Sequence, residues 1–232
     1  NSSLGFQSRG ILAIDVMKQK EKGKRINTSI LSNVERKFIN WMLPKFPNWI
    51  TPDILTLTAF LSGILILTSY YLSNYGKYFL FIASFFIIVH WFADSHDGGL
   101  ARFRKTPRPN YGYYIDHVLD MATVFFIFLG LLLYGLDFKA VFLLFSAFTI
   151  LSYHSILCYQ TKGHLQLSFG KISPTEARIF IILINLLLFF ALDKYAVIVF
   201  YLASIIIFIL SIYQIIYTAR QLDQLDRKEY WR

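Results

Sequence analysis

Residues 78–120 read YFLFIASFFIIVHWFADSHDGGLARFRKTPRPNYGYYIDHVLD. An apolar run leads into two acidic residues and a basic loop, and two more acidic residues then open a second apolar run. A transmembrane helix needs about 20 predominantly apolar residues. This stretch therefore predicts two neighbouring transmembrane helices that carry acidic side chains at adjacent ends.

Apolar runs of this length recur along the chain of 232 residues, of which 56% are hydrophobic and 16% are charged. A typical soluble domain carries about 25% charged residues, so this composition indicates a membrane protein. In lipid a spanning backbone has no water to bond, which makes each run helical. We predict an all-α membrane protein with six transmembrane helices. They cover residues 54–74, 78–101, 113–135, 139–160, 173–193 and 195–218.

The basic residues are distributed unevenly between the two sides of this bundle. Of the 23 Lys and Arg, all but Lys77, Lys139 and Lys194 fall on the side that holds both termini and the second and fourth connections. The positive-inside rule then places both termini and the acidic helix ends in the cytoplasm. The net charge of +9 is spread around membrane helices, so we expect no nucleic-acid partner.

The remaining segments complete the predicted organisation. Residues 1–25 form an N-terminal tail, within which residues 1–16 are interpreted as vector-derived because Met17 opens a basic segment of its own. Residues 47–219 form the six-helix domain, and residues 220–232 form a cytoplasmic C-terminal tail. The single cysteine excludes a disulfide within the chain.

Between the tail and the domain, residues 26–46 predict an N-terminal cytoplasmic amphipathic helix. Ile30, Val34 and Phe38 recur at helical spacing, while polar residues occupy the other faces. Such a helix lies in the membrane interface, or it packs on the cytoplasmic side of the protein itself. Both placements put it at the cytoplasmic surface.

Four acidic residues point to a site, because charges inside a bilayer are costly and usually functional. Asp94 and Asp97 are three positions apart, and Asp116 and Asp120 are four apart, so each pair shares one helix face. A short connection makes the two helices antiparallel neighbours, which brings the four carboxylates together. Their oxygens suit Mg²⁺, Mn²⁺ or Ca²⁺. Two divalent ions would balance the four charges, and paired metal ions are common in phosphoryl transfer.

Small residues accompany the acids. Gly98 and Ala101 clear one side of the first helix, and Gly112 clears the start of the second, so a large ligand can approach the backbone. Arg102 can offer a planar fork to a phosphate. Acids near helix ends can instead cap helices or pair with Arg, and glycines can serve only close packing. The joint occurrence of all of them at this spacing favours a site.

The full pattern resembles the signature of the CDP-alcohol phosphotransferase (CDP-alcohol phosphatidyltransferase) family. It reads Asp94-x-x-Asp97-Gly98-x-x-Ala101-Arg102, then nine residues, then Gly112-x-x-x-Asp116-x-x-x-Asp120. Asp53 and Thr56, after Thr51-Pro52, resemble the entry to the first helix of that family. The resemblance implies a phospho-alcohol group transferred from a CDP-alcohol to a second alcohol, with release of CMP, in phospholipid synthesis. It also implies a homodimer.

The resemblance further implies a role for each residue. Two divalent cations, Mg²⁺ or Mn²⁺, would be bound by Asp94, Asp97, Asp116 and Asp120. Asp120 would also be the general base that takes the proton of the attacking hydroxyl. The nucleotide would lie against Asp53, Thr56, Asp94, Asp97, Gly98, Ala101, Arg102 and Gly112.

The donor and acceptor are left open between two pairs. An Asp116-His117 pair resembles the ethanolamine and choline phosphotransferases, in which the histidine lies near the reaction centre, although His117 can equally be an ordinary helix residue. It favours a CDP-ethanolamine or CDP-choline donor with a diacylglycerol-type acceptor. The alternative is a CDP-diacylglycerol donor with a soluble acceptor such as inositol, inositol phosphate, serine or glycerol phosphate.

The fourth connection bears on the acceptor. Ser173, Pro174 and Glu176 match a helix start. Lys171, Glu176 and Arg178 are also candidates for binding the acceptor. A larger cluster of Arg would indicate a phosphorylated acceptor, and the sequence shows none beyond this pair of basic residues.

A cation transporter is the alternative from another class, because acidic residues in membrane helices can form an ion pathway. Transporters usually place their ions near the middle of the membrane, between repeated halves. Here the acidic residues lie near one end, and the last three predicted helices carry no matching set. The sequence therefore favours the enzyme.

Overall fold

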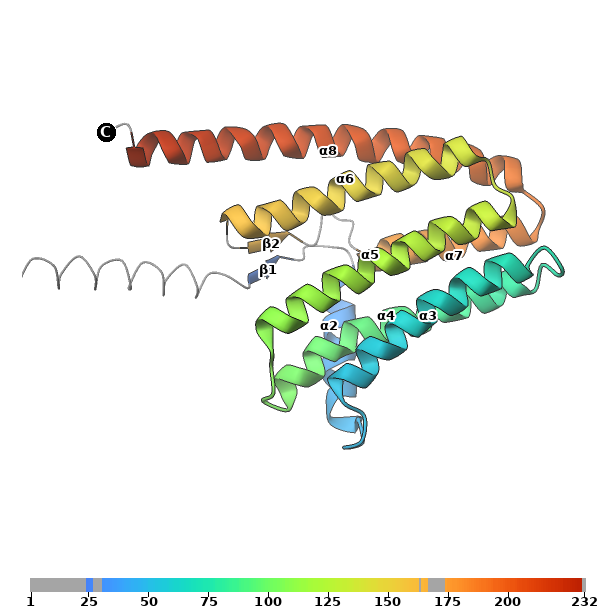
Figure 1. Cartoon of the computed structure of the whole chain (residues 1–232), viewed down its shortest axis with the longest axis horizontal. Helices are drawn as coiled ribbons and strands as arrows, with labels where there is room; N and C mark the ends of the chain where they lie inside the picture. Colours follow the sequence, from blue (N-terminus) through green and yellow to red (C-terminus); the bar gives the residue numbers. More distant parts are fainter. Residues whose placement is uncertain (1–23, 27–30, 163, 167–173, 231–232) are drawn as a thin grey trace, which may run out of the picture. The chain divides into compact units, whose positions relative to one another are not determined.

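Figure 1 shows the protein in a computed structural model, in which helices dominate. The structure describes residues 24–26, 31–162, 164–166 and 174–230. Contacts divide the chain into two compact units. The larger unit comprises residues 30–145 and 174–204, and the smaller unit comprises the rest of the chain.

The larger unit holds the helices that form the site. They are α2 (Ser32–Met42), the 3₁₀ helix η1 (Leu43–Lys45), α3 (Pro52–Leu72), α4 (Phe79–Phe103), α5 (Pro109–Tyr134) and α7 (Pro174–Phe189). The unit also includes the first parts of α6 (Phe138–Lys162) and α8 (Asp193–Tyr230). α3 packs against both α4 and α5, and α4 packs against α7 (Figure 1).

Five helices in the described part of the chain are long and apolar enough to cross a membrane. They are α3, α4, α5, α6 as far as Cys158 and α8 as far as Arg227, and they account for five of the six predicted spans. α7 has only 16 residues. At 1.5 Å per residue it is about 24 Å long, shorter than the hydrocarbon core of about 30 Å. A sixth span at 173–193 therefore stays a prediction.

The segment predicted as an amphipathic helix at 26–46 contains α2, which begins only at Ser32. α2 packs on α4. The ring of Phe38 stacks on Trp91, with centroids 6.0 Å apart. These contacts show that α2 packs on the protein itself. Its location in the membrane interface stays a prediction.

Local signals explain where the helices begin and end. The Thr51 side chain accepts a hydrogen bond from the Ile54 backbone N–H at 3.2 Å and so caps α3, with Pro52 in the first turn. α5 ends at Tyr134, and the next residue, Gly135, has a φ of 105°, in the left-handed region that glycine adopts without strain.

Buried polar side chains link the helices of the larger unit. Tyr70 of α3 donates a hydrogen bond to Asn185 of α7 at 2.7 Å, and the Asn185 amide donates to Ser84 of α4 at 2.9 Å. His90 of α4 bonds Thr123 of α5 at 3.1 Å. Because apolar packing alone discriminates poorly between helix partners in lipid, such bonds help to specify which helices associate.

Gly130 on α5 allows Tyr70 of α3 to pack against its backbone. A Cβ atom at Gly130 would lie 2.5 Å from Cδ2 of Tyr70, which is fully buried and held by Asn185. We expect Gly130→Ala to destabilise the protein by about 1–3 kcal/mol, because the tyrosine ring has no room to move. Thermal unfolding in detergent measures the change. Gly112→Ala is the control, because its Cβ would meet nothing within 4 Å; equal melting temperatures for the two variants would contradict the expectation.

The smaller unit contains the far parts of α6 and α8 and two short strands. β1 (Lys24–Ile26) pairs in parallel with β2 (His164–Gln166), although the sequence predicts no strand. Each strand has three residues and lies outside the candidate spans, where short pairings leave no periodic pattern to detect. The predicted C-terminal tail is helical through Tyr230, within α8.

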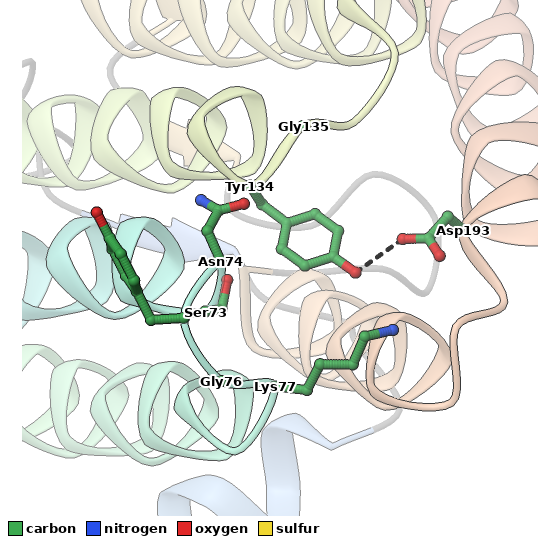
Figure 2. A pocket seen from close by; sticks show the side chains of 8 residues that line it. Ser73, Asn74, Gly76, Lys77, Tyr134, Gly135 and Asp193 are labelled. Carbon is green, nitrogen blue, oxygen red and sulfur yellow. Dashed lines mark hydrogen bonds between the residues drawn. The ribbon is translucent and has the colours of Figure 1, made fainter.

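A cavity of about 400 Å³ lies where α3 and α5 end, opposite the ends that carry the carboxylates. Its polar lining is engaged within the protein: the Tyr134 hydroxyl donates to Asp193 at 2.8 Å (Figure 2), and Lys77 donates to the Leu188 carbonyl at 3.2 Å. These bonds join the end of α5 to the start of α8, and the connection between α3 and α4 to the end of α7. We interpret the cavity as part of the scaffold.

Candidate active site

Three carboxylates meet where α4 approaches its end and α5 begins. Asp94, Asp116 and Asp120 each offer an oxygen that lies within 4.8 Å of the others. Residues 104–108 join α4 to α5 and α3 packs against both helices, which holds the acidic end of α4 near the acidic start of α5. The structure therefore brings together three of the four acidic residues that the spacing singles out.

Asp97, the fourth acidic residue, is engaged by α3 instead. Its Oδ2 accepts a hydrogen bond from the Thr56 hydroxyl at 2.7 Å, and its Oδ1 accepts one from the Gly98 N–H at 2.5 Å. Thr56 lies in the first turns of α3. The bond places the start of α3 beside the carboxylates, where the sequence predicts the nucleotide.

Arg178 of α7 lies against the carboxylates. Its Nη2 donates to Oδ2 of Asp94 at 2.6 Å and lies 3.8 Å from Oδ1 of Asp120. The sequence assigns Arg178 to acceptor binding, and the structure shows its guanidinium paired with Asp94. A basic residue in an apolar helix requires a partner, but the sequence does not say which acid supplies it.

The donor set fits hard divalent cations. Carboxylate oxygens prefer Mg²⁺, Mn²⁺ or Ca²⁺, whereas Zn²⁺ and Cu²⁺ sites usually include histidine or cysteine. Arg178 offsets only part of the negative charge of Asp94, Asp116 and Asp120. The negative charge that remains on these carboxylates favours the binding of a cation between them.

The side chains differ in their exposure. The Asp120 side chain is 43% exposed, compared with 18% for Asp94 and 21% for Asp116. Asp120 is thus the most exposed of the three carboxylates.

The small residues predicted at the nucleotide site have different surroundings. A Cβ at Gly98 would lie 3.3 Å from Nη1 of Arg102, so the arginine head covers that glycine. A Cβ at Gly112 would meet nothing within 4 Å. Ala101 is half-buried on the same helix as Gly98. Open space at Gly112 and an arginine over Gly98 suit a ligand that carries phosphates.

Asp53, also predicted at the nucleotide site, forms an exposed ion pair with Arg108. The Arg108 guanidinium lies 4.3 Å from the centre of the Tyr111 ring. These contacts link the start of α3 to the segment before α5. Exposed pairs of this kind contribute little to stability, so both groups are available to a charged ligand.

His117 lies one residue after Asp116 and 3.8 Å from its carboxylate. Its Nδ1 donates a hydrogen bond to the Tyr113 carbonyl at 2.8 Å. Because that bond fixes the proton on Nδ1, the neutral ring presents Nε2 as an acceptor.

The other residues predicted to bind the acceptor have different outcomes. Glu176 Oε1 accepts a hydrogen bond from the Leu31 N–H at 3.2 Å, which connects α7 to the start of α2. Lys171 lies outside the described residues.

Arg104 has a structural role that sequence reasoning missed. Its guanidinium donates to the carbonyls of Pro47 at 2.8 Å and Phe46 at 3.3 Å, and also to that of Ile50. In the sequence, Arg104 counts only among the basic residues that set the orientation of the protein in the membrane. The structure shows that Arg104 holds the segment between η1 and α3, which sets where α3 starts.

This arrangement is that of a membrane protein with a carboxylate-rich site at one end of its helices. The family model described as CDP-alcohol phosphatidyltransferase matches residues 49–213, and the chain belongs to this family. The protein is accordingly a transferase for phosphate-linked groups. A comparison with curated proteins gave no significant match.

Proposed function

We propose that the protein transfers a phospho-alcohol group from a CDP-alcohol to a second alcohol and releases CMP, in phospholipid synthesis. The observation that carries the proposal is the meeting of Asp94, Asp116 and Asp120 within 4.8 Å. Family membership supports the reaction class. The sidedness of the basic residues supports a site on the cytoplasmic side, and the family resemblance supports a homodimer.

Two divalent ions, Mg²⁺ or Mn²⁺, would be held by Asp94, Asp97, Asp116 and Asp120. Bound there, they would neutralise the donor's pyrophosphate and stabilise the charge that develops on CMP. Asp97 would bind metal while its carboxylate also accepts the hydrogen bond from Thr56. This carboxylate would thus connect the metal site to the start of α3.

The nucleotide would lie between the starts of α3 and α5. Arg102 would approach a phosphate across Gly98 and Ala101, and the open space at Gly112 would admit the ligand. Asp53 and Thr56 would border the same space. These residues belong to α3, α4 and α5, and we propose that α7 contributes to the acceptor site.

Asp120 is proposed as the general base. It takes the proton of the attacking hydroxyl as the new oxygen–phosphorus bond forms at the β-phosphorus and the bond to CMP breaks. An alcohol is a weak nucleophile until such a base withdraws its proton. The greater exposure of the Asp120 side chain supports this role.

His117 is proposed beside the reaction centre as a proton carrier. Its place next to Asp116 and the acceptor state of Nε2 support this role. The Asp116-His117 pair favours CDP-ethanolamine or CDP-choline as donor with a diacylglycerol-type acceptor. The engagement of Arg178 by Asp94 also favours a lipid acceptor, because that guanidinium is already partnered by a carboxylate.

Product analysis tests this choice. Purified protein in lipid receives CDP-ethanolamine, CDP-choline or CDP-diacylglycerol, each with a panel of acceptor alcohols, and chromatography identifies the products. We expect a phospholipid from a headgroup donor and diacylglycerol. A product only from CDP-diacylglycerol would select the alternative pair. No product from any pair, together with no binding of a cytidine nucleotide, would overturn the proposed reaction.

A further inference from the structure

Glu35, in the first turn of α2, collects three hydrogen bonds on one carboxylate oxygen. Its Oε1 accepts from Trp91 Nε1 at 3.0 Å, from Ser95 Oγ at 3.3 Å and from Thr175 Oγ1 at 3.0 Å. Trp91 and Ser95 belong to α4, and Thr175 belongs to the first turn of α7. A single side chain therefore joins α2, α4 and α7.

A second bond connects α2 and α7 in the opposite direction. Glu176 of α7 accepts a hydrogen bond from the N–H of Leu31, the residue that precedes α2. Each helix thus contributes one carboxylate to the other near its start. Two such bonds restrict both sliding and rotation of α7 relative to α2.

The partners of Glu35 are neighbours of the ion pair in the candidate active site. Ser95 follows Asp94 in the chain, and Thr175 precedes Arg178 by three positions on one face of α7. Asp94 and Arg178 bond each other at 2.6 Å. Fixing Ser95 and Thr175 on one oxygen therefore fixes where the two members of the pair meet.

The three donors explain why a carboxylate is suited to position 35. An indole N–H and two hydroxyls donate to one part-buried carboxylate oxygen, and an apolar side chain at this position would remove the acceptor that they share. A carboxylate bonds all three, and its charge strengthens each bond.

We infer that Glu35 is a positioning residue: by holding the start of α7 on α4, it seats Arg178 against Asp94 and Asp120. The inference rests on the proposed function for its catalytic consequence. The seated guanidinium competes electrostatically with a cation for the same carboxylates, and it orients them for the reaction. Loss of Glu35 should therefore tighten divalent-cation binding and slow turnover at the same time.

The test compares Glu35→Ala, Glu35→Gln and the parent, purified in lipid. Mn²⁺ affinity is measured directly by titration followed by electron paramagnetic resonance, without substrate. We expect Glu35→Ala to bind Mn²⁺ about fivefold more tightly, a typical size for coupling between two sites. We also expect kcat for CMP release to fall by about tenfold, with the KM for the donor unchanged, because misplaced groups cost turnover. Glu35→Gln, whose amide oxygen still accepts hydrogen bonds, should restore most of both properties.

Two further variants test the route through α7. Thr175→Val removes the α7 hydroxyl that donates to Glu35 and should reproduce the direction of both effects. In an Arg178→Gln background, Glu35→Ala should change Mn²⁺ affinity no further, because the group that it positions is gone. Lys37→Ala, an exposed residue of the same helix, is the control and should leave Mn²⁺ affinity and kcat unchanged.

The outcomes separate the two claims. A parent that binds Mn²⁺ but never releases CMP, with the Glu35→Ala effect on affinity present, would overturn the proposed reaction and keep the positioning role. A Glu35→Ala variant with a lower melting temperature but unchanged Mn²⁺ affinity would contradict the positioning role and leave Glu35 with a structural role only. An affinity change of the same size in the Arg178→Gln background would also contradict the inference.

Discussion

Asp120→Asn is expected to lower kcat for CMP release by about 100-fold to 10,000-fold, the range that general bases contribute. The amide is nearly the same shape as the carboxylate, but it cannot accept the proton of the attacking hydroxyl. The substitution also keeps the size of the side chain, which is 43% exposed. Initial rates at saturating donor and acceptor measure the effect.

The matched control for this prediction is Asp223→Asn on α8. Asp223 is also exposed and also pairs with an arginine, Arg227, at 2.9 Å. We expect the rate of this variant to equal that of the parent. An Asp120→Asn variant that keeps more than about a tenth of the parent kcat would assign the base to another group, and His117 would be examined next.

Asp116→Asn is expected to weaken divalent-cation binding by at least about 100-fold. Removing a group that only orients a metal ligand typically lowers metal affinity by about 10-fold to 100-fold. Loss of a charged ligand should therefore lower the affinity more. An oxygen of Asp116 lies within 4.8 Å of an oxygen of each of the other two carboxylates. Any cation bound by the cluster would therefore interact with the negative charge of Asp116. Calorimetric titration with Mn²⁺, without substrate, measures the affinity.

Asp53→Asn provides the comparison for the metal prediction. Asp53 is exposed and pairs with Arg108 outside the cluster. Its loss should raise the KM for the CDP-alcohol and leave Mn²⁺ affinity within about twofold, since exposed charges at a distance are screened. Equal losses of Mn²⁺ affinity in Asp53→Asn and Asp116→Asn would contradict the proposed metal site.

Local spacing predicted the part of the site that depends on helix geometry. Residues three or four positions apart share a helix face, and a short connection keeps the end of one helix near the start of the next. Asp94, Asp116 and Asp120 meet for these reasons. The start of α3 was predictable too, since Thr51 and Pro52 are common residues at a helix start.

Contacts between distant segments could not be predicted in the same way. Arg178 lies 84 positions from Asp94, and Thr175 lies 140 positions from Glu35. No periodicity within a helix specifies which other helix its polar residues will meet. Arg104 was interpreted as a topology signal for this reason, because its carbonyl partners lie more than 50 positions earlier in the chain.

The extent of the helices was predictable only within limits. The apolar pattern predicts a span at 173–193, whereas α7 ends at Phe189 after 16 residues. Composition alone does not distinguish a helix that crosses the bilayer from a shorter one that stops at a turn. Likewise, α8 continues to Tyr230, beyond the apolar run, where Arg227 and Asp223 form a helical ion pair.

The most direct test of the central claim is CMP release from a CDP-alcohol by the purified protein in lipid, measured with Mg²⁺ and again after chelation. The proposed function predicts CMP formation that stops when the metal is removed, returns when it is restored and is lost in Asp120→Asn. Metal-independent release, or no release from any CDP-alcohol with any acceptor, would contradict it.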